Sequence, residues 1–295
     1  MNVITRRQFL KRLAWSTTAL GAGMAGYSTL VEPRRVEINH LPIAIKGLPP
    51  AFAGLTIAQL TDLHRSRFVG AGYLNHCIDL ANASRPDLMV FTGDYLTHGR
   101  AHSRRGQLVY GGRDAGAALA LDCARCLGRA RARFGVFASL GNHDHWFDGD
   151  FVAQVIRDRG IPVLRNANTE VRVNGESLPI VGLGDLWTEG VNLSRAFAGV
   201  TAPFALVLMH NPDTFPDWSR PGAHLILAGH THGGQVNLPG IGPPLVPSEY
   251  GAKYAQGLFR RGDTQMYVNR GLGVLFPPVR FNCRPEIAVF HLQSA

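Results

Sequence analysis

The sequence has too few cysteines to build a disulfide framework. There are four in 295 residues, and two of them, Cys123 and Cys126, lie in an alanine-, leucine- and arginine-rich segment that predicts a helix. Residues at i and i+3 share one face of a helix, and no second cysteine pair follows that would complete a zinc site. We therefore expect these cysteines in the core rather than at a redox or zinc centre.

The sequence also lacks a basic stripe interleaved with aromatic residues, although its formal net charge is +9 and its pI is near 9.9. Four of these nine charges lie before residue 31, where there is no acidic residue, which leaves +5 for the rest of the chain. A scattered surplus favours anionic, phosphate-bearing partners or membrane surfaces. It argues against specific recognition of DNA or RNA.

The chain contains no internal repeat and no low-complexity linker. Predicted strands and helices alternate in the first half, with strands at 55–62, 87–92 and 136–140 and helices at about 72–84, 115–133 and 150–159. This order predicts a parallel sheet with functional residues at its carboxyl edge. Short strands dominate the second half, where Asn174-Gly175 and Gly262-Asp263 predict hairpins. We expect one α/β domain of two sheets.

Residues 1–31 predict a targeting segment rather than part of the fold. The stretch from Thr5 to Lys11, TRRQFLK, resembles the twin-arginine export motif at every position, and a mildly apolar region from Leu13 to Val31 follows it. Low hydrophobicity suits export through the twin-arginine translocase, which carries folded proteins. No clean A-x-A cleavage site is present, so the segment is expected either to be cleaved or to remain as a membrane anchor. Both outcomes place the body in the periplasm or on the outer face of the cytoplasmic membrane.

Residues of types that commonly bind metals follow the ends of five apolar runs. His230 and His232 follow the run 223–228, with Gly229 and Gly233 beside them. Side chains two positions apart in an extended backbone point the same way. The other four runs are followed by Asp62 and His64, by Asp94, by Asn142, His143 and Asp144, and by His210. The chain repeatedly delivers a ligand to the carboxyl end of a buried strand, which predicts a metal site.

The residue types fit hydrolysis of a phosphate ester. That reaction needs charge neutralisation, a nucleophile and help for the leaving group, and two divalent ions about 3.5–4 Å apart supply the first two. Asp94, alone after Gly93 at a strand end, suits a bridging carboxylate, and Asn142 offers a neutral oxygen that limits negative charge facing the substrate. Mixed nitrogen and oxygen ligands favour manganese, iron or zinc over calcium.

The motifs D-x-H, GD, GNHD, H and GHTH, in this order, resemble the calcineurin-like metallophosphoesterase family over residues 52–293. The resemblance implies a four-layer α/β/β/α sandwich of two mixed sheets flanked by helices. It implies one metal held by Asp62, His64 and His232, a second held by Asn142, His210 and His230, and Asp94 as the bridge. His143 would then protonate the leaving group or stabilise its charge, worth roughly 10²–10⁴ in rate, and Asp144 would orient the site.

Other positions narrow the resemblance. Purple acid phosphatases place a tyrosine where this sequence has Thr97, which disfavours them. The segments 233–235, 269–273 and 278–287 are similar to those of the YkuE/YaeI-type envelope phosphoesterases. Arg270 and Arg280 are candidates for phosphate contact. His145 replaces a tyrosine expected after GNHD in many members, and it is a candidate for substrate contact.

Together these features predict a metal-dependent phosphodiesterase that acts on an envelope or lipid-linked phosphoester by attack of a metal-activated hydroxide. The apolar loop 238–247 either packs rigidly or forms a rim for an acylated substrate. Two alternatives stay open. A UDP-2,3-diacylglucosamine-type pyrophosphate hydrolase of lipid A synthesis shares the fold, but its substrate is made on the cytoplasmic face. A metal-stabilised envelope binding protein would keep every ligand without requiring His143.

Overall fold

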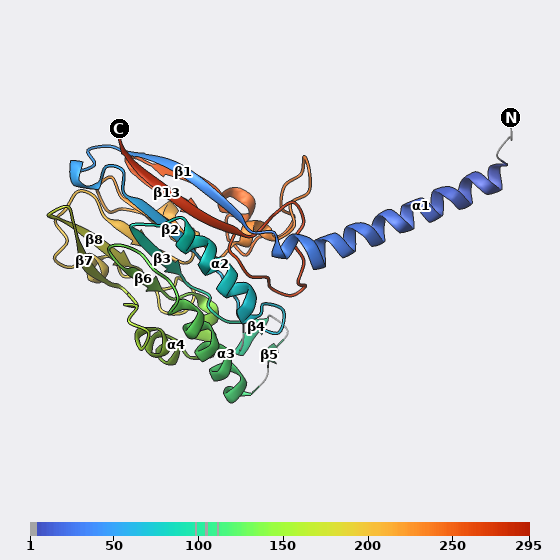
Figure 1. Cartoon of the computed structure of the whole chain (residues 1–295), viewed down its shortest axis with the longest axis horizontal. Coiled ribbons are helices and arrows are strands. Elements are labelled where there is room, and N and C mark those ends of the chain that lie inside the picture. The colour runs from blue at the N-terminus through green and yellow to red at the C-terminus, as the bar shows by residue number, and fades with distance from the viewer. Residues whose placement is uncertain (1–4, 98, 104–105, 111) are drawn as a thin grey trace.

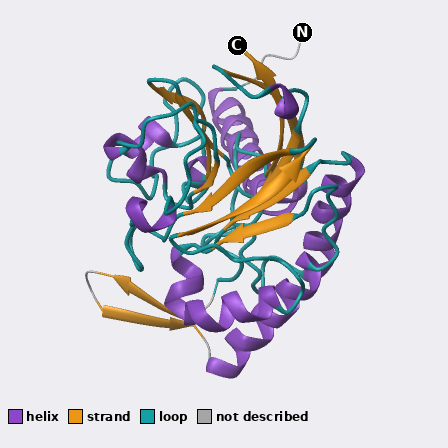
Figure 2. Cartoon of the chain, turned by 90° about the vertical axis from the view of Figure 1, so that its left-hand side faces the viewer, coloured by secondary structure: helices purple, strands orange, loops and turns teal. Residues whose placement is uncertain are grey.

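Two mixed β-sheets pack face to face with helices outside them (Figures 1 and 2). The computed structural model describes residues 5–97, 99–103, 106–110 and 112–295, with no side chains described between 98 and 111. The first sheet has the strand order β1-β13-β2-β3-β6 and the second β11-β12-β10-β9-β8-β7. The predicted four-layer sandwich is confirmed, although the helices on the outer face of the second sheet are short.

The elements have the following bounds. The first sheet comprises β1 (Glu37–Ile45), β2 (Thr56–Leu60), β3 (Leu88–Thr92), β6 (Val136–Ser139) and β13 (Glu286–Ser294). The second comprises β7 (Ala167–Val173), β8 (Glu176–Gly182), β9 (Leu206–Leu208), β10 (Leu225–Ala228), β11 (Gly257–Arg261) and β12 (Thr264–Val268). A separate hairpin pairs β4 (Gly99–Ser103) with β5 (Gly106–Tyr110). The helices are α1 (Arg6–Gly26), α2 (Ala71–Ala83), α3 (Arg113–Leu127), α4 (Asn142–Arg157) and the single turn α5 (Leu193–Ala196).

The central strands are buried on both faces. In β3, Met89 and Phe91 belong to the core beneath α2, α3 and α4, whereas Leu88 and Val90 belong to the core between the two sheets. Strands covered on both sides are apolar throughout rather than alternating. This explains why the strands that lead to the predicted ligands are continuous apolar runs in the sequence.

Most predicted elements are present, with shifted ends. The helix predicted for 115–133 ends at Leu127. The helix predicted from residue 150 begins at Asn142, with a break in its helical dihedral angles at Asp148. Both predicted hairpins are confirmed, by β7–β8 and by β11–β12. The β4–β5 hairpin carries no apolar alternation in sequence and was not predicted.

The N-terminal helix α1 extends away from the body (Figure 1), and none of its residues is buried. Among the described residues, no helix combines the length and the apolar character needed to cross a membrane. The body begins before residue 52, the predicted start of the domain. β1 pairs with β13 along its whole length, and Glu32 is buried, where its carboxylate accepts a hydrogen bond from the Cys283 backbone N–H.

Candidate metal centre

All seven predicted ligands lie at the carboxyl ends of strands from both sheets. They follow β2, β3, β6, β9 and β10 and are at most 4% exposed: Asp62, His64, Asp94, Asn142, His210, His230 and His232. The parallel strands within each sheet end at the same edge. Segments that are distant in sequence therefore meet at one place.

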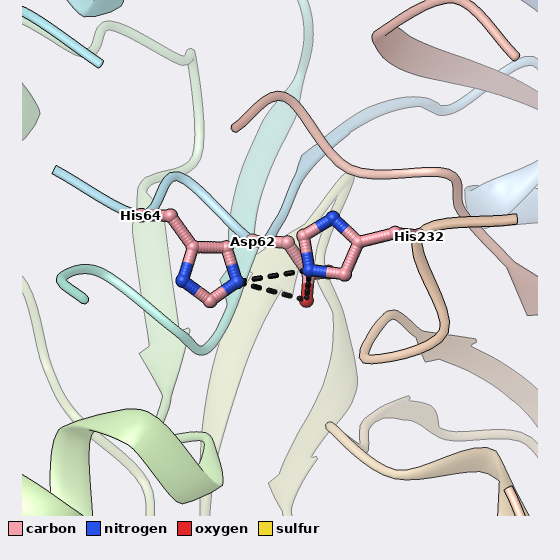
Figure 3. A group of neighbouring side chains, drawn as sticks. All are labelled: Asp62, His64 and His232. Carbon is pink, nitrogen blue, oxygen red and sulfur yellow. Dashed lines mark hydrogen bonds and ion pairs between the residues drawn. The ribbon is translucent and has the colours of Figure 1, made fainter. Parts of the chain in front are cut away.

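Asp62, His64 and His232 form the first group (Figure 3). The Nε2 atoms of the two histidines lie 2.9 Å apart, and Oδ1 of Asp62 lies 3.4 Å from Nε2 of His232 and 3.9 Å from Nε2 of His64. One potential ligand atom from each residue lies within 4.8 Å of the others. This spacing could hold one metal ion.

Asp94, His210 and His230 form a second group with the same 4.8 Å limit between their ligand atoms. Nε2 of His210 lies 3.3 Å from Oδ2 of Asp94 and 3.2 Å from Oδ1 of Asn142. The same Oδ2 atom of Asp94 lies 3.6 Å from Nε2 of His64, a member of the first group. Asp94 therefore reaches both groups, as a carboxylate that bridges two ions must.

The donor set fits a divalent cation. Burial lowers the pKa values of His64 and His232 well below the usual range and that of His230 to about 3, so their imidazoles are neutral. Neutral imidazole is the form that binds metal. Nε2 of His230 is buried and has no hydrogen-bond partner among the described residues. Burying this nitrogen unpaired costs free energy that a bound cation would offset.

His210 differs from the other histidines. Burial alone would lower its pKa, but the carboxylates of Asp94, Asp62 and Asp185 together outweigh burial and raise the pKa of His210 well above its usual value. Metal binding at the second group would therefore release a proton.

Hydrogen bonds fix the orientation of two ligand rings. Nδ1 of His64 lies 2.7 Å from Oγ1 of Thr97, and Nδ1 of His210 lies 2.8 Å from the carbonyl oxygen of Thr92. Contacts at one ring nitrogen leave the other facing the cluster. Thr97 thus orients the ring of His64, at the position where purple acid phosphatases have a tyrosine.

Asp144 joins two ligand-bearing loops. Its carboxylate accepts hydrogen bonds from the backbone N–H groups of Asp94, Tyr95 and Gly141, at 2.8 to 2.9 Å. It therefore holds the loop after β3 against the loop after β6. This agrees with the predicted orienting role, and Asp144 is a positioning residue rather than one that contacts substrate.

His143 lies beside the cluster. Its backbone N–H donates to Oδ1 of Asp94 at 2.8 Å, and its ring stands edge-on to the ring of His64, with centroids 4.9 Å apart. Burial lowers the pKa of His143 below its usual value. One ring nitrogen of His143 lies within 4.8 Å of potential ligand atoms of His64 and Asp94.

The ligand loops use strained backbone. Five of the predicted ligands have positive φ: Asp62 (51°), His64 (46°), Asp94 (56°), His230 (72°) and His232 (53°). Such conformations cost of order 1–3 kcal/mol each and concentrate at functional sites. They also correct the sequence argument for the two GHTH histidines. These do not lie in extended backbone, and the tight turn sends one to each group.

Close backbone approach makes certain glycines necessary. A Cβ atom at Gly229 would lie 2.3 Å from Oδ2 of Asp62, and one at Gly141 would lie 2.3 Å from Oδ1 of Asp94. At Gly271, where φ is +70°, a Cβ atom would lie 2.6 Å from Cβ of Asp62. The loop containing Gly271 therefore packs directly against the side chain of Asp62.

The profile of the calcineurin-like phosphoesterase family matches residues 55–234. The chain belongs to this family. It is 34% identical to the uncharacterized metallophosphoesterase YkuE of Bacillus subtilis, over all of this chain and 99% of that protein. It is 32% identical to the phosphodiesterase YaeI of Escherichia coli, over 98% of this chain and all of that protein. The pyrophosphatase LpxG of Chlamydia muridarum is 28% identical, over 88% and 90% of the two chains. The predicted class, a phosphoric ester hydrolase, is confirmed.

The two arginines predicted to contact phosphate both form contacts within this phosphoesterase, and a phosphate contact of Arg270 stays a prediction. Arg280 is fully buried, and its guanidinium donates hydrogen bonds to the carbonyl oxygens of Arg270, Gly271, Gly273 and Cys283. Arg270 forms ion pairs with Glu37 and Glu286. The structure corrects the prediction for Arg280, because its donors are used inside the protein to hold the loop behind Asp62.

His145, the third predicted substrate contact, lies outside both ligand groups. Its Nε2 atom is 3.7 Å from the Glu189 carboxylate, and its contact with substrate stays a prediction. Asp185 was missed, although it follows the apolar run 178–183 as the other ligands follow theirs. Its carboxyl group is buried beside the second group, and burial raises its pKa.

We expect Arg280→Met to destabilise the phosphoesterase by about 3 kcal/mol or more, because several buried carbonyl groups lose their donor. Denaturant unfolding measures the change. Arg284→Met is the matched control, since Arg284 is partly exposed and its guanidinium donates to the surface-accessible carboxylate of Glu37 rather than to a cluster of buried carbonyl groups. Equal stability of the two variants would contradict the structural role assigned to Arg280.

Proposed function

We propose that this phosphoesterase hydrolyses a phosphodiester and holds two divalent ions to do so. Asp62, His64 and His232 would hold one ion; Asn142, His210 and His230 would hold the other. The observation that carries the proposal is the position of Asp94, whose one oxygen lies 3.6 Å from His64 of the first group and 3.3 Å from His210 of the second.

The charge of the ligand set supports an anionic substrate. The proposed ligands include two carboxylates, Asp62 and Asp94, while the other five are neutral when bound to metal. Two divalent ions would therefore leave the centre with a positive charge, which attracts a phosphate group. When bound, such ions neutralise the phosphate oxygens and activate a water molecule.

The residues of the chain would position and complete this chemistry. Asp144 holds the loops that carry Asp94 and Asn142 together. His143, anchored through its backbone N–H to Asp94, would supply the proton or the positive charge that the departing alcohol needs. The similarity to YaeI, named a phosphodiesterase, favours diesters over monoesters.

We further infer that the enzyme acts outside the cytoplasm on an envelope phosphoester. Its N-terminal segment would then be a twin-arginine signal peptide or membrane anchor. Support comes from the TRRQFLK stretch and from α1, which has no buried residue. A lipid-linked substrate is supported by three exposed apolar side chains on two loops, Ile241 and Leu245 (80% and 81% exposed) and Phe276 (73%). The similarity to LpxG keeps an acylated pyrophosphate as the second candidate substrate.

The test is an assay of the purified full-length protein against bis(p-nitrophenyl) phosphate and p-nitrophenyl phosphate. The protein is first stripped with a chelator, and Mn²⁺, Fe²⁺ or Zn²⁺ is then added back. We expect no turnover without metal and a preference for the diester once metal is restored. A strong preference for the monoester would overturn the diesterase assignment. Inactivity with every ion would overturn the proposal that the protein hydrolyses these esters at all.

A further inference from the structure

Two tryptophans from separate elements flank the candidate metal centre. Trp146 lies in the first turns of α4, and its ring contacts that of His143, with centroids 4.6 Å apart at an angle of 61°. Trp187 lies in the loop after β8, and its ring stands edge-on to His230, at 4.4 Å and 86°. One indole therefore borders the proposed acid, and the other borders a ligand of the second ion.

The two indole rings are nearly parallel and lie close to each other. Their planes differ by 19°, and their centroids are 6.4 Å apart. Trp187 is 43% exposed, although tryptophan is highly buried on average in folded proteins. An indole left open to solvent beside reactive residues offers a flat apolar surface that a substrate can cover.

A buried carboxylate fixes the loop that carries Trp187. Oδ1 of Asp185 accepts hydrogen bonds from the backbone N–H of Trp187 at 3.1 Å and from the hydroxyl of Thr188 at 2.8 Å. The backbone carbonyl of Asp185 accepts two more, from the N–H groups of Glu189 and Gly190. A ring held in place before binding loses little conformational entropy when a ligand packs against it.

We propose that Trp146 and Trp187 form an aromatic platform for one ester group of the substrate, so that the enzyme selects phosphodiesters carrying a flat aromatic ring. The platform rests on the proposed phosphodiesterase function. Its position beside His143 and His230 places the covered ester group next to the phosphorus atom. Stacking on one indole contributes roughly a tenfold preference over an ester that has no ring.

The test compares bis(p-nitrophenyl) phosphate with methyl p-nitrophenyl phosphate. Both release p-nitrophenol, so the leaving group is constant and only the retained ester group changes. Trp187→Leu keeps an apolar contact with His230 but removes the flat ring, and Trp187→Phe keeps a ring. We expect kcat/KM of the leucine variant to fall about tenfold for the diaryl substrate and less than about threefold for the methyl ester. The phenylalanine variant should retain most of the wild-type preference.

Trp15→Leu is the matched control, because Trp15 is exposed and belongs to α1, the helix that extends away from the body (Figure 1). Bound metal is measured in every variant. If both Trp187 variants lose some metal, the difference in substrate preference between Trp187→Leu and Trp187→Phe decides the result. An equal fall for the two substrates, or no fall, would overturn the platform and leave Trp187 as a packing residue for His230. Failure of the wild-type protein to hydrolyse either diester would instead overturn the proposed function.

Discussion

Asp94→Asn should lower kcat by about 10³-fold or more and reduce the bound metal below the wild-type content. The substitution keeps the size of the side chain but removes the negative charge that lies within 3.6 Å of His64 and 3.3 Å of His210. It also replaces the carboxylate, whose Oδ2 atom faces both ligand groups, with a neutral amide. Elemental analysis of the purified protein and turnover of bis(p-nitrophenyl) phosphate measure the two effects.

Asp263→Asn provides the control for this substitution, because Asp263 is exposed and pairs with Lys46 at the surface. It should leave metal content and turnover unchanged. An Asp94→Asn protein that binds two ions and turns over at the wild-type rate would rule out a bridging role.

His143→Ala should lower kcat by about 10²–10⁴-fold while the metal content stays at the wild-type level. The backbone N–H that donates to Asp94 survives the substitution, so the bridging carboxylate keeps this contact. The loss should be larger for diphenyl phosphate than for bis(p-nitrophenyl) phosphate, because phenolate is the poorer leaving group and depends more on a proton donor. Parallel assays with the two substrates measure this difference.

His40→Ala serves as the control, since His40 is exposed and contacts His291 at the edge of the first sheet. Unchanged turnover of both substrates by His143→Ala would remove His143 from catalysis and favour the metal-stabilised binding protein. Loss of metal together with activity would make His143 a ligand instead of an acid.

The sequence predicted which residues gather at the candidate metal centre, because each follows a buried strand and parallel strands end at one edge. Asp185 obeys the same rule after β8 but was not selected, although Gly184-Asp185 repeats the glycine-aspartate pair of Gly93-Asp94. Trp187 could not be identified from sequence either. Its role depends on the ring of His230 against which it stands.

Arg280 shows where residue type misleads. An arginine near the end of a phosphoesterase domain suggests phosphate contact, but only the surroundings decide what a guanidinium binds. Here the carbonyl groups of the loop 270–273 surround it and exclude solvent. The GHTH histidines were likewise assigned extended backbone, whereas positive φ at both turns them toward different ligand groups.

The sequence alone determined which residue types are available for metal and in which order the strands present them, because burial and strand periodicity are local properties of the chain. The tertiary structure decided which residues lie close enough together to share an ion and which only contact those residues. His64 and His232 meet at 2.9 Å across 168 positions of sequence. Contacts over such separations depend on how the two sheets pack, and no local pattern encodes that packing.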